Sequence, residues 1–119
     1  MKIAIPADDD KKSVSMSFGR CPLYAIADSE TGEMNFIKNT AANAPGGAGI
    51  KASQSLVDAG VNVVLTPRCG QNAADVLKAA NIAMFKTTSN SLDGMIRAYK
   101  AGTLEALNDV HPGYHGHGG

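Results

Sequence analysis

Residues 61–85 read VNVVLTPRCG QNAADVLKAA NIAMF and contain the pattern that decides the fold. Residues 61–65 are almost continuously apolar, which is typical of a strand that is covered on both faces of its sheet. Asn72 is placed to cap a following helix, in which apolar residues recur at intervals of three and four, namely Ala73, Val76, Leu77 and Ala80. Residues 82–85 form a second short apolar run. A strand, a helix and a strand in this order predict a right-handed crossover between two parallel strands.

The segments on either side extend this unit to a complete α/β domain. Residues 3–5 are apolar and end at a proline, which predicts a first strand. Residues 24–27 and 34–36 alternate in character around a turn that contains a glycine, which predicts a β-hairpin. Apolar positions at helical spacing predict two more helices, one that opens at the glycine-rich segment 46–49 and one that Ser91 caps. The result is a five-stranded mixed sheet with one antiparallel strand and flanking helices.

The composition fits one small domain and argues against several kinds of partner. A chain of 119 residues suffices for a single core. Its 11 basic residues balance 11 acidic ones, whereas proteins that bind nucleic acid need a basic excess, so we expect no nucleic-acid partner. No apolar stretch approaches the roughly 20 residues of a membrane span, and the first residues lead directly into a strand. We therefore expect no membrane association and a cytoplasmic protein, in which the two cysteines are thiols or ligands and not a disulfide.

We predict a folded domain over residues 1–107 and a flexible tail over residues 108–119. The tail is rich in glycine and histidine and has almost nothing to bury. Its histidines, which are His111, His115 and His117, are candidates for a weak metal site through neutral imidazoles.

The predicted topology brings several loops to one edge of the sheet. Open α/β sheets bind ligands at the carboxyl ends of their parallel strands, where loops and helix N-termini meet. The loops expected at this edge are residues 8–22, 39–49, 66–72 and 87–90. The first three supply the candidate ligand-binding residues, which are Phe18, Gly19, Arg20, Cys21, Gly46, Gly47, Gly49, Arg68, Cys69, Gly70 and Asn72.

The chemistry of these candidates points to an anionic ligand that contains a soft metal. Cys21 follows Arg20, and Cys69 follows Arg68. A guanidinium group and a helix N-terminus lower the pKa of a thiol and favour the thiolate, which binds soft metals. Glycines at the start of a helix leave peptide N–H groups accessible to an anion. We therefore predict a binding cradle, with Cys21 and Cys69 as the candidate metal ligands, and no catalytic centre.

The same residues also have structural interpretations. Either cysteine could fill space in the core, where free cysteine is common. The arginines could hold nearby carboxylates such as Asp8, and the glycines could form nothing more than a tight loop. Met84 and Met95 are expected in the core.

The motifs themselves resemble those of a known family. Residues 17–26, SFGRCPLYAI, are similar to the Phe-Gly-Arg segment of the dinitrogenase iron–molybdenum cofactor biosynthesis family. The glycine-rich helix start at 46–49 and the sequence CGQNA at 69–73 match further motifs of that family in the same order. The resemblance covers residues 1–107 and implies a ribonuclease H-like fold. Some cofactor-carrying relatives place a histidine, a proposed ligand, directly before the Phe-Gly pair, whereas this chain has Ser17.

The resemblance also implies a function. Members of that family include carriers of the nitrogenase cofactor or its precursor. The resemblance therefore implies a non-catalytic carrier of an iron–sulfur or iron–molybdenum type cluster, or of a precursor, in metallocluster assembly or trafficking related to nitrogen fixation. The expected partners are the metallocluster and a cluster-assembly or acceptor protein.

Two other classes of function compete with a carrier. A nuclease with a ribonuclease H-like fold needs several carboxylates that converge on a metal ion, and residues 61–66 supply none. Thiol redox catalysis lacks a Cys-x-x-Cys motif. A regulatory or interaction domain that binds a small anion or a partner protein is the main alternative.

Overall fold

The computed structural model describes residues 1–107, and the histidine-containing tail predicted at residues 108–119 lies outside the described residues. The strands and helices follow one another as β1 (Lys2–Ala7), β2 (Leu23–Asp28), β3 (Met34–Lys38), α1 (Ala48–Asp58), β4 (Val63–Thr66), α2 (Gln71–Ala79), β5 (Ala83–Lys86) and α3 (Leu92–Lys100). This is the predicted order of elements.

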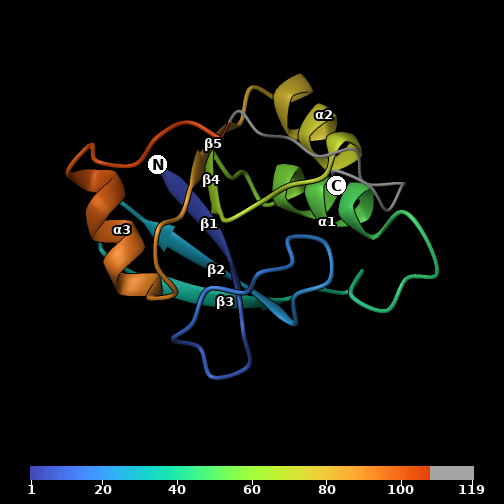
Figure 1. Cartoon of the computed structure of the whole chain (residues 1–119), viewed down its shortest axis with the longest axis horizontal. Coiled ribbons are helices and arrows are strands. Elements are labelled where there is room, and N and C mark those ends of the chain that lie inside the picture. The colour runs from blue at the N-terminus through green and yellow to red at the C-terminus, as the bar shows by residue number, and fades with distance from the viewer. Residues whose placement is uncertain (108–119) are drawn as a thin grey trace.

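Within the described residues the strands form one mixed sheet in the order β3-β2-β1-β4-β5 (Figure 1). β2 pairs antiparallel with both β1 and β3. On the other side of β1, β4 and then β5 continue the sheet in parallel. The prediction of a five-stranded mixed sheet with flanking helices is confirmed.

The helices cover both faces of the sheet. α1 and α2 pack side by side on one face, and α3 lies on the other (Figure 1). Residues of β1 and β4 alternate between two cores: Ala4 and Val64 face α1 and α2, whereas Ile5 and Leu65 lie in the core beneath α3. Because both faces are covered, residues 61–65 are almost continuously apolar. Each large aliphatic side chain buried here contributes roughly 1.5–3 kcal/mol of hydrophobic free energy.

The starts of the helices agree only in part with the sequence patterns. Ser91 caps α3 as predicted, and its Oγ accepts a hydrogen bond of 3.0 Å from Gly94 N. The prediction that Asn72 caps α2 is wrong, because the chain leaves its extended conformation at Gly70 and Asn72 already lies inside the first turn. The N-cap of α1 is Gly47, whose φ of 68° is a left-handed conformation that favours glycine.

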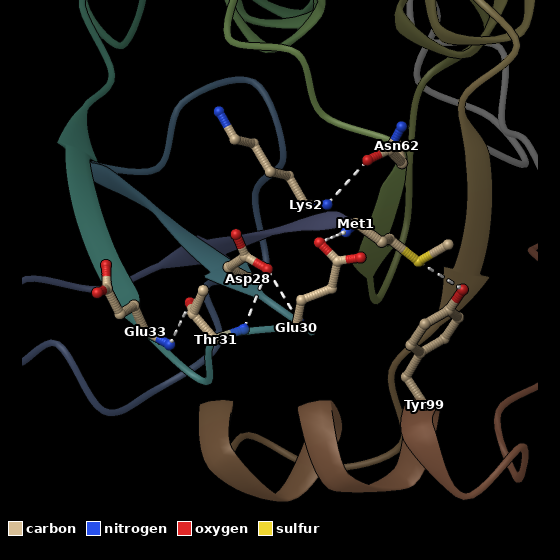
Figure 2. A network of polar contacts seen from close by, with 8 residues as sticks. All are labelled: Met1, Lys2, Asp28, Glu30, Thr31, Glu33, Asn62 and Tyr99. Atoms are coloured by element: carbon tan, nitrogen blue, oxygen red, sulfur yellow. Dashed lines mark hydrogen bonds and ion pairs between the residues drawn. The ribbon is translucent and has the colours of Figure 1, made fainter.

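The edge of the sheet where the parallel strands begin is held together by polar contacts (Figure 2). Lys2 N donates a hydrogen bond of 2.8 Å to Asn62 Oδ1 and thereby joins the starts of β1 and β4. Asp28 Oδ1 accepts a hydrogen bond of 2.8 Å from Glu30 N in the turn between β2 and β3. Tyr99 of α3 donates to Met1 Sδ. The loops predicted to bind a ligand all lie at the opposite edge.

Three small residues let the loop before β2, helix α1 and helix α2 meet. A Cβ atom on Gly19 would lie 3.0 Å from Gly49 N and 3.1 Å from Gly49 Cα. A Cβ atom on Gly49 would lie 3.2 Å from the Cβ of Ala73. Ser53 Oγ, inside the same contact, donates to Gly49 O at 2.8 Å and lies 3.3 Å from Ala73 O. The three segments therefore touch without intervening side chains.

We expect Gly19→Ala to destabilise the protein by roughly 1–3 kcal/mol, because the added methyl group meets the rigid backbone of α1. Urea denaturation measures the change. Gly46→Ala is the matched control: nothing lies within 4 Å of its added Cβ and its φ is not positive, so its free energy of unfolding should stay within about 0.5 kcal/mol of the wild type. Equal stability of the two variants would contradict the close contact.

Candidate functional site

A pocket of about 540 Å³ opens at the predicted edge of the sheet, between the N-terminal ends of α1 and α2. Its lining includes all of the predicted site residues except Cys21 and Gly46. The predicted residues in the lining are Phe18, Gly19, Arg20, Gly47, Gly49, Arg68, Cys69, Gly70 and Asn72, and the others are Met16, Ser17, Ala48, Ile50 and Ala73. The structure thus brings together three loops that are far apart in the chain, while the binding role of each residue stays a prediction.

Two helix N-termini face this pocket. The N-cap positions of α1 and α2 are Gly47 and Gly70, and neither helix has a side-chain cap or an acidic residue in its first turn. The first intrahelical hydrogen bonds are donated by Lys51 N and Ala74 N, so the earlier N–H groups of both helices have no intrahelical acceptor. Each helix N-terminus also carries about half a positive charge from its aligned peptide dipoles. The pocket is therefore electrostatically suited to an anion.

Two arginines extend this positive potential to the rim. Arg20 and Arg68 are both exposed and both line the pocket. Nη1 of Arg20 donates to the carbonyl groups of Ala42 and Ala44, at 3.1 and 3.0 Å. The guanidinium group is held by these two bonds and not by Asp8. Its other N–H groups remain available for a ligand.

Both cysteines are buried, each with 1% of its surface exposed. Cys69 forms part of the pocket wall, whereas Cys21 packs behind it, with its Sγ 3.5 Å from Phe18 O. Burial raises the pKa of Cys21, and burial raises the pKa of Cys69 to about 11. The expectation that Arg20 and Arg68 lower the thiol pKa is wrong, because removal of water from the sulfur outweighs the arginines, which stay in solvent. Both groups are neutral thiols near pH 7.

The loop that carries Phe18 and Arg20 is fixed by residues behind it. Tyr24 is 1% exposed, its hydroxyl group donates to Phe18 O, and the two rings lie 5.6 Å apart. Burial raises the pKa of Tyr24 far above its ordinary value, so its hydroxyl stays a hydrogen-bond donor.

Asn39 is a supporting residue that the sequence analysis missed. Its Nδ2 donates to the carbonyl groups of Gly19 and Cys21 at 3.0 and 2.9 Å, and its Oδ1 accepts from Ala41 N at 3.0 Å. The side chain is buried and joins the loop before β2 to the segment that leads into α1. A polar residue directly after the end of a strand, at the edge where ligands bind, was the available signal.

Two further observations concern residues 1–107 as a whole. No group of three or more histidine, cysteine, aspartate or glutamate side chains in this part of the chain is arranged to hold a metal ion. None of its helices is long and apolar enough to span a membrane. Met84 and Met95 lie in the core, as predicted.

The family model described as "dinitrogenase iron–molybdenum cofactor" matches residues 1–102. The chain belongs to this family. The resemblance inferred from the Phe-Gly-Arg, glycine-rich and Cys-Gly-Gln-Asn motifs is thereby confirmed. Membership associates the chain with the handling of metalloclusters related to the iron–molybdenum cofactor.

Similar proteins and structures match nearly the whole chain. An uncharacterized protein of Methanocaldococcus jannaschii is 34% identical over 108 residues, which are 88% of this chain and 90% of the relative. The apo form of the orange protein from Desulfovibrio gigas has a TM-score of 0.84 at 25% identity and covers 90% of this chain and 92% of its own. A protein from Thermotoga described as a NifB protein has a TM-score of 0.76 at 35% identity and covers 89% of this chain and 92% of its own.

The buried thiol of Cys69 in this family member predicts a loss of stability at alkaline pH. The folded pKa is about 11, against an ordinary value of 9.0, so the unfolded chain loses its proton first. The contribution of this thiol is fully present below about pH 9 and is lost as the pH rises toward 11, by on the order of 2 kcal/mol. Urea denaturation in reductant between pH 8 and 11 measures the slope. In Cys69→Ala this part of the slope should disappear, and an unchanged alkaline slope would contradict the prediction.

Proposed function

We propose that this protein binds and carries an anionic cluster of iron–sulfur or iron–molybdenum type, or a precursor of one, in the pocket between α1 and α2. It catalyses no reaction and passes its cargo between a cluster-assembly protein and an acceptor protein in the cytoplasm. The observation that carries the proposal is the meeting of two uncapped helix N-termini with Arg20 and Arg68 in a pocket whose described lining contains no carboxylate.

The charge of the cargo is the first argument. Clusters built from metal ions and sulfide carry a net negative charge when their ligands are thiolates or sulfides. Peptide N–H groups and guanidinium groups stabilise such a charge at fixed positions, and charge-assisted hydrogen bonds are about twice as strong as neutral ones. Arg20 is held in place by Ala42 and Ala44 before any ligand arrives, so little side-chain entropy is lost on binding.

The size of the pocket is the second argument. About 540 Å³ lies within the range of small-molecule sites, roughly 300–1,000 Å³. Gly47 and Gly49 line it through backbone alone, which leaves space for a compact cargo close to the start of α1.

The thiols would bind the metal after the anion has made these electrostatic contacts. Cys69 lies in the pocket wall, and we propose it as the direct metal ligand. Because its pKa is about 11, it must release a proton when it binds a metal, so ligation should strengthen as the pH rises. Cys21 lies behind Phe18 and could bind the cargo only if the loop at 18–21 moved.

We also assign the fold to the ribonuclease H-like class. The strand order β3-β2-β1-β4-β5, with β2 antiparallel to its neighbours, supports this assignment.

A regulatory domain that senses a small oxyanion is the second candidate. The neutral, buried thiols favour it, because neither of them offers a thiolate at neutral pH. The two functions differ in the ligand, and loading experiments separate them.

Arg68→Gln tests the anion site. We expect the Kd for molybdate, measured by calorimetry at low salt, to rise about tenfold, because one charge-assisted contact is removed. Arg97→Gln is the matched control, since Arg97 is an exposed arginine on α3, which lies on the other face of the sheet, and its Kd should equal that of the wild type. Equal affinity of all three proteins, or no binding at all, would remove the electrostatic basis of the proposal.

Anaerobic reconstitution with iron and sulfide tests the cargo. The loaded protein should show visible charge-transfer absorption and contain iron and sulfide in a constant ratio. Cys69→Ser should weaken this absorption strongly and Cys21→Ser only slightly, because Cys69 alone of the two lines the pocket. Protein that stays colourless under every loading condition, while it binds molybdate, would favour the regulatory alternative over a carrier.

A further inference from the structure

Met16 is an exposed apolar side chain at the pocket. It lines the pocket and has 67% of its surface exposed. Among residues 1–107 the only other large apolar side chain that is exposed is Met1, at 47%, which lies at the opposite edge of the sheet. Met84 and Met95 are in the core and Met34 is half-buried, so Met16 is the most exposed of the internal methionines.

The exposure of Met16 does not come from a slack loop. Ser15 N donates to Pro6 O at 2.8 Å, and Val14 N donates to Asn90 O at 2.8 Å. On the other side, Ser17 Oγ accepts a hydrogen bond of 3.1 Å from Arg20 N. The backbone is therefore fixed on both sides, and it presents the thioether to solvent beside the pocket.

The thioether changes which anions the pocket can accept. A methionine side chain is apolar and polarizable, and it offers no hydrogen-bond donor. An oxygen-surfaced anion in contact with it loses hydration without compensation. A sulfur-surfaced anion is less strongly hydrated and gains dispersion contacts, while the exposed surface of Met16 is removed from water.

We infer that Met16 is a specificity-determining residue, which covers the bound anion and favours a sulfur surface over an oxygen surface. The inference rests on the proposed function, since it assumes that the pocket binds an anion. The inference goes beyond the proposed function because it names the residue that distinguishes a cluster or thio-anion from the oxyanions of the cell.

Molybdate and tetrathiomolybdate are suitable probes, because both are tetrahedral dianions of one metal and differ in their surface atoms. We expect the wild type to bind tetrathiomolybdate more tightly than molybdate. Met16→Ala should weaken tetrathiomolybdate binding about fivefold through the lost apolar contact. It should not weaken molybdate binding, because molybdate gains nothing from contact with the thioether. Met16→Leu keeps the apolar area and should stay within about twofold of the wild type. Both variants should fold normally, since the side chain is mostly exposed.

NMR of protein labelled with ¹³C at the methionine methyl groups gives an independent readout. The methyl signal of Met16 should shift when tetrathiomolybdate binds, because the ligand contacts the thioether. Met1 is the internal control, because it is exposed at the edge of the sheet remote from the pocket, and its signal should not shift.

The inference alone is overturned if the wild type binds both anions and Met16→Ala binds each of them as tightly as the wild type does, or if that variant weakens the binding of both anions to the same extent. Loss in Met16→Leu as large as in Met16→Ala would also overturn it, since sulfur coordination and not an apolar cover would then be at work. Failure of the wild type to bind either anion would instead remove the anion site itself, and with it the proposed function.

Discussion

The site depends on a backbone contact between three segments that are distant in the chain. Gly19 lies against the first turn of α1 at Gly49, and Gly49 lies against Ala73 in the first turn of α2. Side chains larger than these would push the segments apart, because atoms closer than about 3.4 Å repel. Since each contact involves the beginning of a helix, the same packing that closes the core also sets two helix N-termini beside one another. The electrostatic character of the pocket is thus a consequence of how tightly its walls pack.

The supporting residues make this arrangement rigid. Asn39 joins two of the segments through the carbonyl groups of Gly19 and Cys21, and Arg20 joins the same two through Ala42 and Ala44. Arg20 therefore belongs both to the frame and to the rim of the pocket. A binding site that is assembled before its ligand arrives loses little entropy on binding, which suits the proposed role of a carrier.

Much of the architecture could be predicted because it depends on short-range patterns. The apolar runs at 61–65 and 82–85 and the helical spacing between them specify a crossover unit, and sheet geometry then brings the loops to one edge. The state of the cysteines could not be predicted in this way. Neighbouring arginines in the sequence suggest thiolates, but the pKa of Cys69 depends on how completely other segments exclude water from its sulfur. The cap of α2 at Gly70 and the role of Asn39 likewise follow from tertiary contacts.

The neutral thiols and the positive pocket are consistent with each other. A thiolate in the empty pocket would attract metal ions indiscriminately and would be open to oxidation. Under the proposed function, burial of Cys69 would keep its proton in place until a ligand brings enough metal charge to displace it. Arg68, the helix N-termini and the exposed thioether of Met16 would act earlier and select the ligand by its charge and surface. Selection would thus precede ligation, which is the order expected of a carrier that accepts a preformed cluster and refuses free metal ions.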